Sequence, residues 1–281
     1  CHSYLTYEMV SSLFPEKTNF IPHSLPEELY KQLPEKEIKN RRSEVLGREK
    51  VDDFILFWIN RNARRKRPAD LLWSWKLFKD KVLQEKNSFD CTLLLHTDPR
   101  DSEGPNLLAV AEHFDIIDDV VFSTQRLDFD AINVLHNISD ACINISYAEG
   151  FGLATSEAMQ VGNPIIAVKT GGLTRQVVDH RDGSENGVAL DVDFKSLVGS
   201  QNVPFILEDY AKAENIAEAM YKLWKMPEKD RKQLGQKARD YVLSEFSYQK
   251  TIDLWHDSLL KLVTEWKEEK PKLWSLEEVV I

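Results

Sequence analysis

The sequence predicts an α/β protein built on a doubly wound parallel sheet, followed by C-terminal helices. Short apolar segments alternate with segments of helical spacing, and this alternation is typical of βαβ units. The apolar segments are continuous, as in strands that helices cover on both faces. Ligands of such sheets bind beyond the carboxyl ends of the strands, so we expect the functional residues in the loops that follow them.

Five apolar segments are predicted to be the strands: residues 51–59, 91–97, 119–124, 141–146 and 164–168. Helices are expected at residues 68–86, 105–114, 129–139 and about 152–162, from residue 171 in GGLTRQVVD, and at 211–226, 228–244 and 248–267. Residues 180–210 are acidic and dotted with glycines, which indicates a long excursion at the rim of the sheet. The last helix carries an apolar stripe that needs a cover, formed by Ile252, Trp255, Leu259, Leu262 and Trp266.

The composition argues against several classes of protein. With a net charge of -10 over 281 residues, the chain is poorly suited to binding nucleic acid. It has no run of about eighteen apolar residues and no basic segment followed by an apolar one at its start, so we expect neither a membrane span nor a signal peptide. The cysteines Cys1, Cys91 and Cys142 are far apart, which favours reduced core thiols in a cytosolic protein over disulfides or a zinc site.

Five basic residues follow the first predicted strand in the segment NRNARRKRP: Arg61, Arg64, Arg65, Lys66 and Arg67. At the carboxyl end of a strand they would face the ligand crevice, where Arg and Lys side chains bind phosphate oxygens. A solvated basic turn is the alternative, but cations at the start of a helix are disfavoured by its dipole. We therefore expect a phosphate-binding loop.

Two glutamates flank a glycine turn after the fourth predicted strand, in the segment EGFGLATSE at residues 149–157. Glycines let the backbone approach a ligand, and the free N–H groups of a helix that starts near Leu153 attract anions. Beside an anion site, carboxylates are suited to sugar hydroxyls, with Glu157 on the vicinal hydroxyls of a ribose and Glu149 on another polyol. The alternative is that these acids stabilise the helix dipole.

Other motifs carry weaker signals. Gly171 and Gly172 form a second glycine turn in KTGGLTRQ, after the fifth predicted strand. His96 is a candidate ligand contact or a local hydrogen-bonding residue, whereas His113 and His136 are interpreted as ordinary helix residues. The sequence has no GxGxxG, GxxxxGKS/T, HExxH or paired CxxC motif, so we expect no dinucleotide fingerprint, P-loop or metal site.

Together these segments resemble the retaining glycosyltransferases of family 4, which have the two-domain GT-B fold. EGFGLATSEAM resembles their E-x7-E signature, and RNARRK resembles the Arg and Lys pair that they use on the donor diphosphate. NFIPHSLP at residues 19–26 is similar to their interdomain link, and NPIIAVKTGGLTRQVV to the strand and glycine pair after the signature. FSYQKTIDLWHDSLLKL is similar to the helix that crosses back to the N-terminal domain, and the resemblance extends from about residue 19 to residue 265.

The resemblance implies that the matching residues bind a nucleotide-diphospho-sugar. Arg61 and Lys66 would neutralise the diphosphate leaving group in place of a metal, and Glu149 would contact the donor sugar, which makes these three the implied catalytic residues. The other implied donor-binding residues are Ser123 and Arg126 near the base, Glu157 on the ribose, and Gly150, Phe151, Gly152, Leu153, Gly171 and Gly172. No cofactor or metal is implied, because the nucleotide-sugar is a substrate.

The resemblance also implies a domain organisation. Residues 1–40 correspond to a remnant of an N-terminal domain and the interdomain link, residues 41–246 to a Rossmann-like donor-binding domain, and residues 247–281 to the crossover helix and a tail. Because the chain starts at Cys1, we expect that an N-terminal acceptor domain is missing from it. Family members commonly have a Glu shortly after the glycine pair, where this sequence has Arg175 and Gln176.

The sequence therefore predicts the donor-binding half of a metal-independent retaining glycosyltransferase of the hexosyltransferase type, with a glycan, lipid or protein as acceptor. We expect a cytoplasmic protein, and a peripheral position at a membrane stays open. The alternative is a non-catalytic nucleotide-sugar-binding module or subunit that needs a partner acceptor domain. A sugar phosphorylase of similar fold is less favoured, because no segment resembles one that carries a pyridoxal-phosphate lysine.

Overall fold

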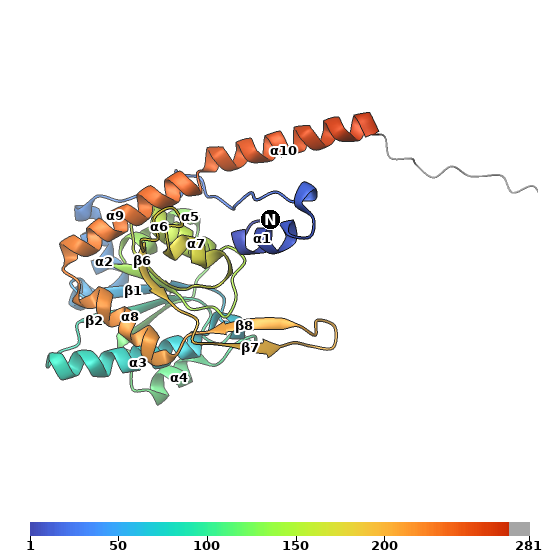
Figure 1. The fold of residues 1–281 in the computed structure, drawn as a ribbon. Helices are drawn as coiled ribbons and strands as arrows, with labels where there is room; N and C mark the ends of the chain where they lie inside the picture. Colours follow the sequence, from blue (N-terminus) through green and yellow to red (C-terminus); the bar gives the residue numbers. More distant parts are fainter. Residues whose placement is uncertain (270–281) are drawn as a thin grey trace, which may run out of the picture.

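The computed structural model describes residues 1–269 and has a six-stranded parallel sheet at its centre (Figure 1). The strands lie in the order β3-β2-β1-β4-β5-β6, and every neighbouring pair is parallel. Their bounds are Phe54–Ile59 (β1), Cys91–His96 (β2), Val120–Ser123 (β3), Ala141–Asn144 (β4), Ile165–Val168 (β5) and Gly187–Leu190 (β6). The predicted doubly wound sheet is confirmed, although β1 begins at Phe54 and not at residue 51.

Alternate residues of β1 pack into separate cores on the two faces of this sheet. Leu56 and Trp58 belong to a core that includes Leu71 of helix α3 (Pro68–Glu85). Ile55 and Phe57 belong to another core, which includes residues of helix α5 (Phe129–Asn137). Because both faces are buried, the strand is apolar at every position, and only the strand ends can reach a ligand.

The other helices lie close to their predicted positions: α4 (Leu107–His113), α6 (Leu153–Gln160), α7 (Thr174–Val177), α8 (Ala213–Lys225), α9 (Glu228–Glu245) and α10 (Tyr248–Glu269). Short 3-10 turns occupy Pro15–Lys17, Arg48–Lys50, Arg64–Lys66, Ile117–Asp119 and Gly171–Leu173. Two helices were not predicted, α1 (Tyr4–Ser11) and α2 (Glu35–Leu46). In α2 only Leu46 is buried, so its sequence EKEIKNRRSEVL has no apolar face from which a helix could be inferred.

The prediction of a long excursion over residues 180–210 is wrong at residues 187–190, which join the sheet, and is confirmed for the hairpin that follows them (Figure 1). Gly187–Leu190 forms β6 at the edge of the sheet, and β7 (Phe194–Val198) pairs antiparallel with β8 (Ile206–Tyr210). These two strands form a hairpin that extends away from the sheet, with its tip clear of the other elements (Figure 1). β6 was not recognised in the sequence, because it is only four residues long and lies among glycines and acidic residues.

Helix α10 confirms the predicted last helix, and most of it extends away from the sheet (Figure 1). Its apolar stripe is exposed within residues 1–269, from 42% at Ile252 to 62% at Trp266. The helices described at residues 1–269 include none that is both long and apolar enough to cross a membrane. Of the predicted tail, residues 270–281 lie outside the described residues.

The cysteine prediction is confirmed for two of the three residues. Cys91 and Cys142 are free and buried, and burial raises the pKa of both thiols. Cys1 is also free, but it is exposed, so the expectation of a core thiol is wrong there.

Candidate donor-binding site

The site lies where the strand order reverses. The chain proceeds from β1 through β2 to β3 on one side, and then places β4 against the other side of β1. In doubly wound sheets this switch point is the crevice in which ligands bind. The loops that follow β1 and β4 therefore leave neighbouring strand ends, and these loops are the ones that carry the predicted basic residues and the predicted glutamates.

Lys66 and Glu149 form an ion pair between these two loops. Lys66 Nζ donates to Glu149 Oε2 at 2.6 Å, and the two side chains are only 11% and 12% exposed. Burial lowers the pKa of Lys66, and the Glu149 carboxylate opposes that shift. Arg65 adds a second cation, since its Nη1 donates to Glu149 Oε2 at 3.0 Å and to the Ala148 carbonyl at 2.7 Å.

Arg61 lies in the same basic loop but pairs elsewhere. Its guanidinium makes two hydrogen bonds to Asp101, of 2.7 and 3.1 Å, and its side chain is 63% exposed. The structure thus brings Lys66, and not Arg61, into contact with Glu149. Arg65 was part of the predicted basic loop but was not singled out, because sequence spacing does not reveal which cation reaches the neighbouring strand end.

The two predicted glycine turns pack against each other. Gly172 N donates to the Glu149 carbonyl at 3.0 Å. A Cβ added at Gly171 would lie 1.9 Å from the Glu149 carbonyl oxygen, and Gly171 has a positive φ of 48°. Gly152, at the start of α6, has a φ of 95°. These contacts require glycine, and they hold the backbone of Glu149 in place.

Gln176 supports the first of these turns. It is fully buried, and its side-chain Nε2 donates to the carbonyls of Phe151 at 2.8 Å and of Gly152 at 3.1 Å. Its Oε1 also accepts a hydrogen bond from Thr155. The side-chain amide of Gln176 thus fixes the turn.

Two further predicted residues border this turn, and they differ in exposure. Phe151 is buried, with its ring edge-to-face against Phe246 at 5.2 Å and His23 at 5.5 Å. His23 belongs to the NFIPHSLP segment, so that segment contacts the turn. Burial lowers the pKa of His23. Leu153 begins α6 as predicted and is 44% exposed. A Cβ added at Gly150 would meet no atom within 4 Å.

Glu157 lines a cavity of about 490 Å³ together with residues of the loop after β3. The predicted Arg126 is among the lining residues, and the others are Tyr30, Ile59, Leu127, Asp128, Phe129 and Ile132. Of the residues expected near the base, Arg126 therefore shares a cavity with Glu157. Ser123 Oγ and His96 Nδ1 instead share a hydrogen bond of 2.9 Å. Burial lowers the pKa of His96.

A buried histidine holds the Glu157 carboxylate. His136 Nε2 lies 3.1 Å from Glu157 Oε2, and His136 is completely buried. Tyr30 also lines this cavity, and burial and the Glu157 charge raise its pKa. His136 is a helix residue as interpreted, and its contact with Glu157 is the part that the sequence did not reveal. The signal was its place on the apolar face of α5, because a buried imidazole needs a polar partner.

Over residues 1–269, no three His, Cys, Asp or Glu side chains are arranged to hold a metal ion. The chemistry of the site comes from two cations paired with a buried carboxylate, a glycine turn at a helix start, and a second carboxylate in a neighbouring cavity. Such a set is suited to a ligand that has both anionic oxygens and hydroxyl groups.

Comparison with known sequences gives a family and several relatives. The model of the family described as "Glycosyl transferases group 1" matches residues 39–241. The trehalose synthase of Pyrococcus horikoshii is 30% identical over 131 residues, which are 47% of this chain and 26% of that protein. The trehalose synthase of Thermococcus litoralis is 28% identical over 178 residues, 60% of this chain and 40% of that protein. The chain thus matches less than half the length of either relative.

Solved structures confirm the GT-B type of fold. Sucrose-phosphate synthase from Thermosynechococcus elongatus superposes with a TM-score of 0.69 at 20% identity, over 92% of this chain and 57% of that chain. HepE from Anabaena, in complex with UDP and glucose, gives a TM-score of 0.71 at 17% identity, over 93% of this chain and 62% of that chain. At these identities the likeness concerns the fold alone.

Proposed function

Since this chain belongs to the group 1 glycosyl transferases, we propose that it binds the nucleotide-diphospho-sugar donor of a retaining glycosyltransferase of family 4. The contact between Lys66 and Glu149 at the switch point of the sheet is the observation that carries the proposal. The structures of HepE in complex with UDP and glucose and with UDP-glucose support a nucleoside diphosphate as the leaving group here.

The basic loop serves the leaving group in this proposal. Transfer breaks the bond between the anomeric carbon and the diphosphate oxygen, and negative charge develops on the departing diphosphate. Lys66 stabilises that charge from a buried position, Arg65 reaches the anion from the rim, and Arg61 reaches it once its guanidinium leaves Asp101. Retention requires that the acceptor oxygen bond to the face of the sugar that the diphosphate leaves. In this arrangement no metal is needed to neutralise the charge.

The carboxylates and the glycine turns hold the rest of the donor. Glu149 accepts hydrogen bonds from the sugar hydroxyls while it fixes the Lys66 ammonium group. The backbone N–H groups of residues 150–153 and of Gly171 face the diphosphate and the sugar, whereas Gly172 N donates to the Glu149 carbonyl and holds this turn in place. Glu157 accepts bonds from the ribose hydroxyls in the 490 Å³ cavity, and residues 123–126 contact the base.

The domain roles follow the same proposal. Residues 41–246 form the donor domain, residues 247–281 the crossover helix and tail, and residues 1–40 the link to an acceptor domain. The acceptor is a glycan, lipid or protein that this acceptor domain selects. The location that we propose is cytoplasmic, with a peripheral position at a membrane for a lipid acceptor.

A thermal-shift screen against UDP, GDP, ADP and CDP tests the binding step, because a ligand of the folded state raises the unfolding temperature. A radiolabelled nucleotide-sugar that contains the nucleotide found to bind is then mixed with the protein. The slow hydrolysis of this nucleotide-sugar is measured with and without EDTA. We expect one nucleotide to stabilise the protein, and turnover that EDTA does not change. Binding without turnover, even with acceptors, would favour a non-catalytic module, and no stabilisation by any of the four would contradict the proposal.

A further inference from the structure

We infer that the root of the β7–β8 hairpin positions the loops of the donor site, and that Glu208 is the positioning residue that acts on the basic loop. The inference rests on the proposed function, since it gives these loops their ligand. It concerns a segment that the sequence presented as an irregular excursion and that the donor-site residues do not include. Four consecutive residues of the root, 208–211, make contacts with three separate loops.

The first loop is the basic one. The Glu208 side chain is only 7% exposed, and both of its oxygens pair with Arg64, whose Nη1 donates to Oε2 at 3.2 Å. Tyr210 donates its hydroxyl to the same carboxylate at 2.7 Å. Arg64 starts the single 3-10 turn that ends at Lys66, so a hold on Arg64 restricts the backbone that carries Lys66. Arg67 Nη2 donates to the Ala211 carbonyl at 3.0 Å and closes the other end of this turn.

The other two loops follow β4 and β5. Asp209 N donates to the Tyr147 carbonyl at 2.9 Å, and Thr170 Oγ1 donates to Asp209 Oδ2 at 2.7 Å. The rings of Tyr147 and Tyr210 lie 4.2 Å apart. Tyr147 N in turn donates to the Arg65 carbonyl at 3.0 Å. The hairpin root therefore fixes the loop of Glu149 relative to the loop of Lys66.

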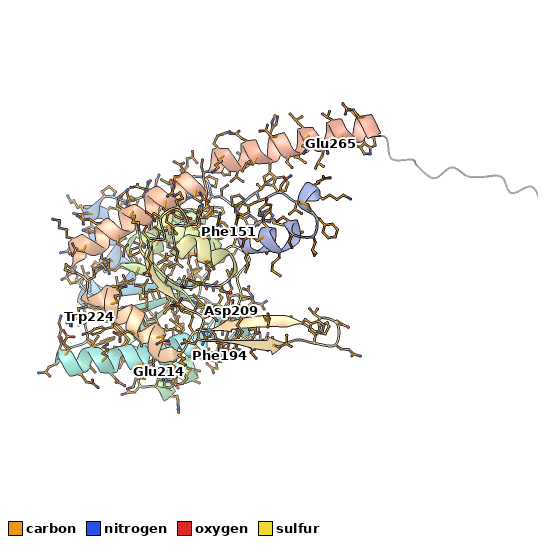
Figure 2. The ribbon with its side chains drawn as sticks, in the orientation of Figure 1. Phe151, Phe194, Asp209, Glu214, Trp224 and Glu265 are labelled. Atoms are coloured by element: carbon orange, nitrogen blue, oxygen red, sulfur yellow. The ribbon has the colours of Figure 1, made fainter. Side chains whose placement is uncertain are left out.

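The root and the tip of the hairpin differ in their surroundings. Figure 2 shows Asp209 and Phe194 where the hairpin leaves the body of the molecule. The tip, residues 199–205, extends beyond it, and Phe205 there is 80% exposed. Positioning is thus a property of the root. A variant in which Asn-Gly replaces residues 199–205 keeps the root, because Val198 and Ile206 are already paired and Asn-Gly is a favoured two-residue turn.

Loss of the Glu208 carboxylate should loosen the loops without unfolding the protein. Arg64 is 65% exposed, so Glu208→Gln leaves no buried cation without a partner. A displacement of a cation by about 1 Å is enough to weaken transition-state contacts strongly. Asp119→Asn is a matched control, because Asp119 also pairs with a lysine, Lys79, at 2.6 Å and is 16% exposed.

Hydrogen exchange measured by mass spectrometry tests the positioning directly. In Glu208→Gln we expect amides of residues 62–67 and 146–149 to exchange about tenfold faster, while other segments and the unfolding temperature match those of the wild type. Asp119→Asn and the shortened hairpin should keep these loops protected. Unchanged protection of both loops in Glu208→Gln would overturn the inference, and so would a general loss of protection, which indicates a merely structural role.

A double-mutant cycle then asks whether Glu208 acts through Arg64. The affinity is measured by calorimetry for the nucleoside diphosphate that the wild type binds among UDP, GDP, ADP and CDP. We expect Glu208→Gln to weaken binding about fivefold in the wild type and less than about twofold in an Arg64→Gln background. Equal losses in both backgrounds, or no loss, would overturn the inference while wild-type binding still supports the proposed function. If the wild type binds none of the four, the proposed function fails, and hydrogen exchange alone decides the positioning.

Discussion

Lys66 Nζ lies 2.6 Å from Glu149 Oε2, although 83 positions of sequence separate the two residues. Both side chains are almost nine-tenths buried, and they come from neighbouring strand ends at the switch point of the sheet. A buried ammonium group of this kind is held in one place before any ligand arrives. A fixed cation stabilises developing charge without reorganising during the reaction, which is the property that a leaving diphosphate requires.

Replacing Lys66 by Met should remove this stabilisation and keep most of the packing. Hydrogen bonds to charged groups contribute about 1.5 to 3 kcal/mol, so we expect the dissociation constant of the nucleoside diphosphate to rise about tenfold to hundredfold. Isothermal titration calorimetry measures this change. Lys79→Met is the control, because Lys79 also has a carboxylate partner at 2.6 Å but lies outside the site. Equal affinity in Lys66→Met and wild type would contradict the phosphate role.

The affinity should also depend on pH through Lys66. Burial lowers its pKa below the ordinary value of 10.5, and the protonated form binds the anion, so affinity should fall as the pH rises through this lowered pKa. The same shift makes protonated Lys66 unfavourable for folding, and this cost is fully present below the lowered pKa and is lost as the pH rises from that value to 10.5. Calorimetry from about pH 7 to about pH 10 measures the fall in affinity. In Lys66→Arg the curve should be flat, and a wild type as flat as this variant would refute the assignment.

Most of the sheet could be predicted because its signals are local. FILFWI at β1 is apolar at each position, since both faces of the strand are buried, and the same holds for β2. β6 could not be predicted, because its four residues form a strand only through their pairing with β5. In the hairpin, exposed Phe194 and Leu197 give the pattern of neither a buried strand nor an amphipathic one.

The site was predictable in its chemistry and less so in its contacts. The basic loop and the glutamate turn were visible as sequence segments, and their approach followed from the sheet topology. The hydrogen-bond partners of individual side chains could not be predicted, because His136, Gln176 and Glu208 contact residues that are distant in the sequence. An arginine such as Arg61 can turn to a neighbouring carboxylate, and spacing alone does not show which one it selects.

Glu157 should distinguish ribonucleotides from analogues that lack the ribose hydroxyls. Glu157→Gln preserves an acceptor for His136 Nε2 but weakens hydrogen bonds from vicinal hydroxyls. We expect its affinity for the ribonucleoside diphosphate to fall about tenfold or more, and that for the 2′,3′-dideoxy analogue to change less than about twofold. Competition calorimetry compares the two ligands, with the remote Glu218→Gln as the control. Equal losses for both ligands would remove the ribose role.

Gly150→Ala separates ligand approach from folding. A Cβ at this position would meet no protein atom within 4 Å, and Gly150 does not have a positive φ, so the unfolding temperature should match that of the wild type. If the donor approaches the backbone there, the added methyl group occupies its space, and the affinity for the donor should fall about tenfold. Gly172→Ala is the contrasting variant, because its Cβ would lie 2.5 Å from the Phe151 Cα and should lower the unfolding temperature. Thermal unfolding and calorimetry on both variants make the comparison, and a Gly150→Ala protein that binds as well as the wild type would show that the donor does not approach this turn.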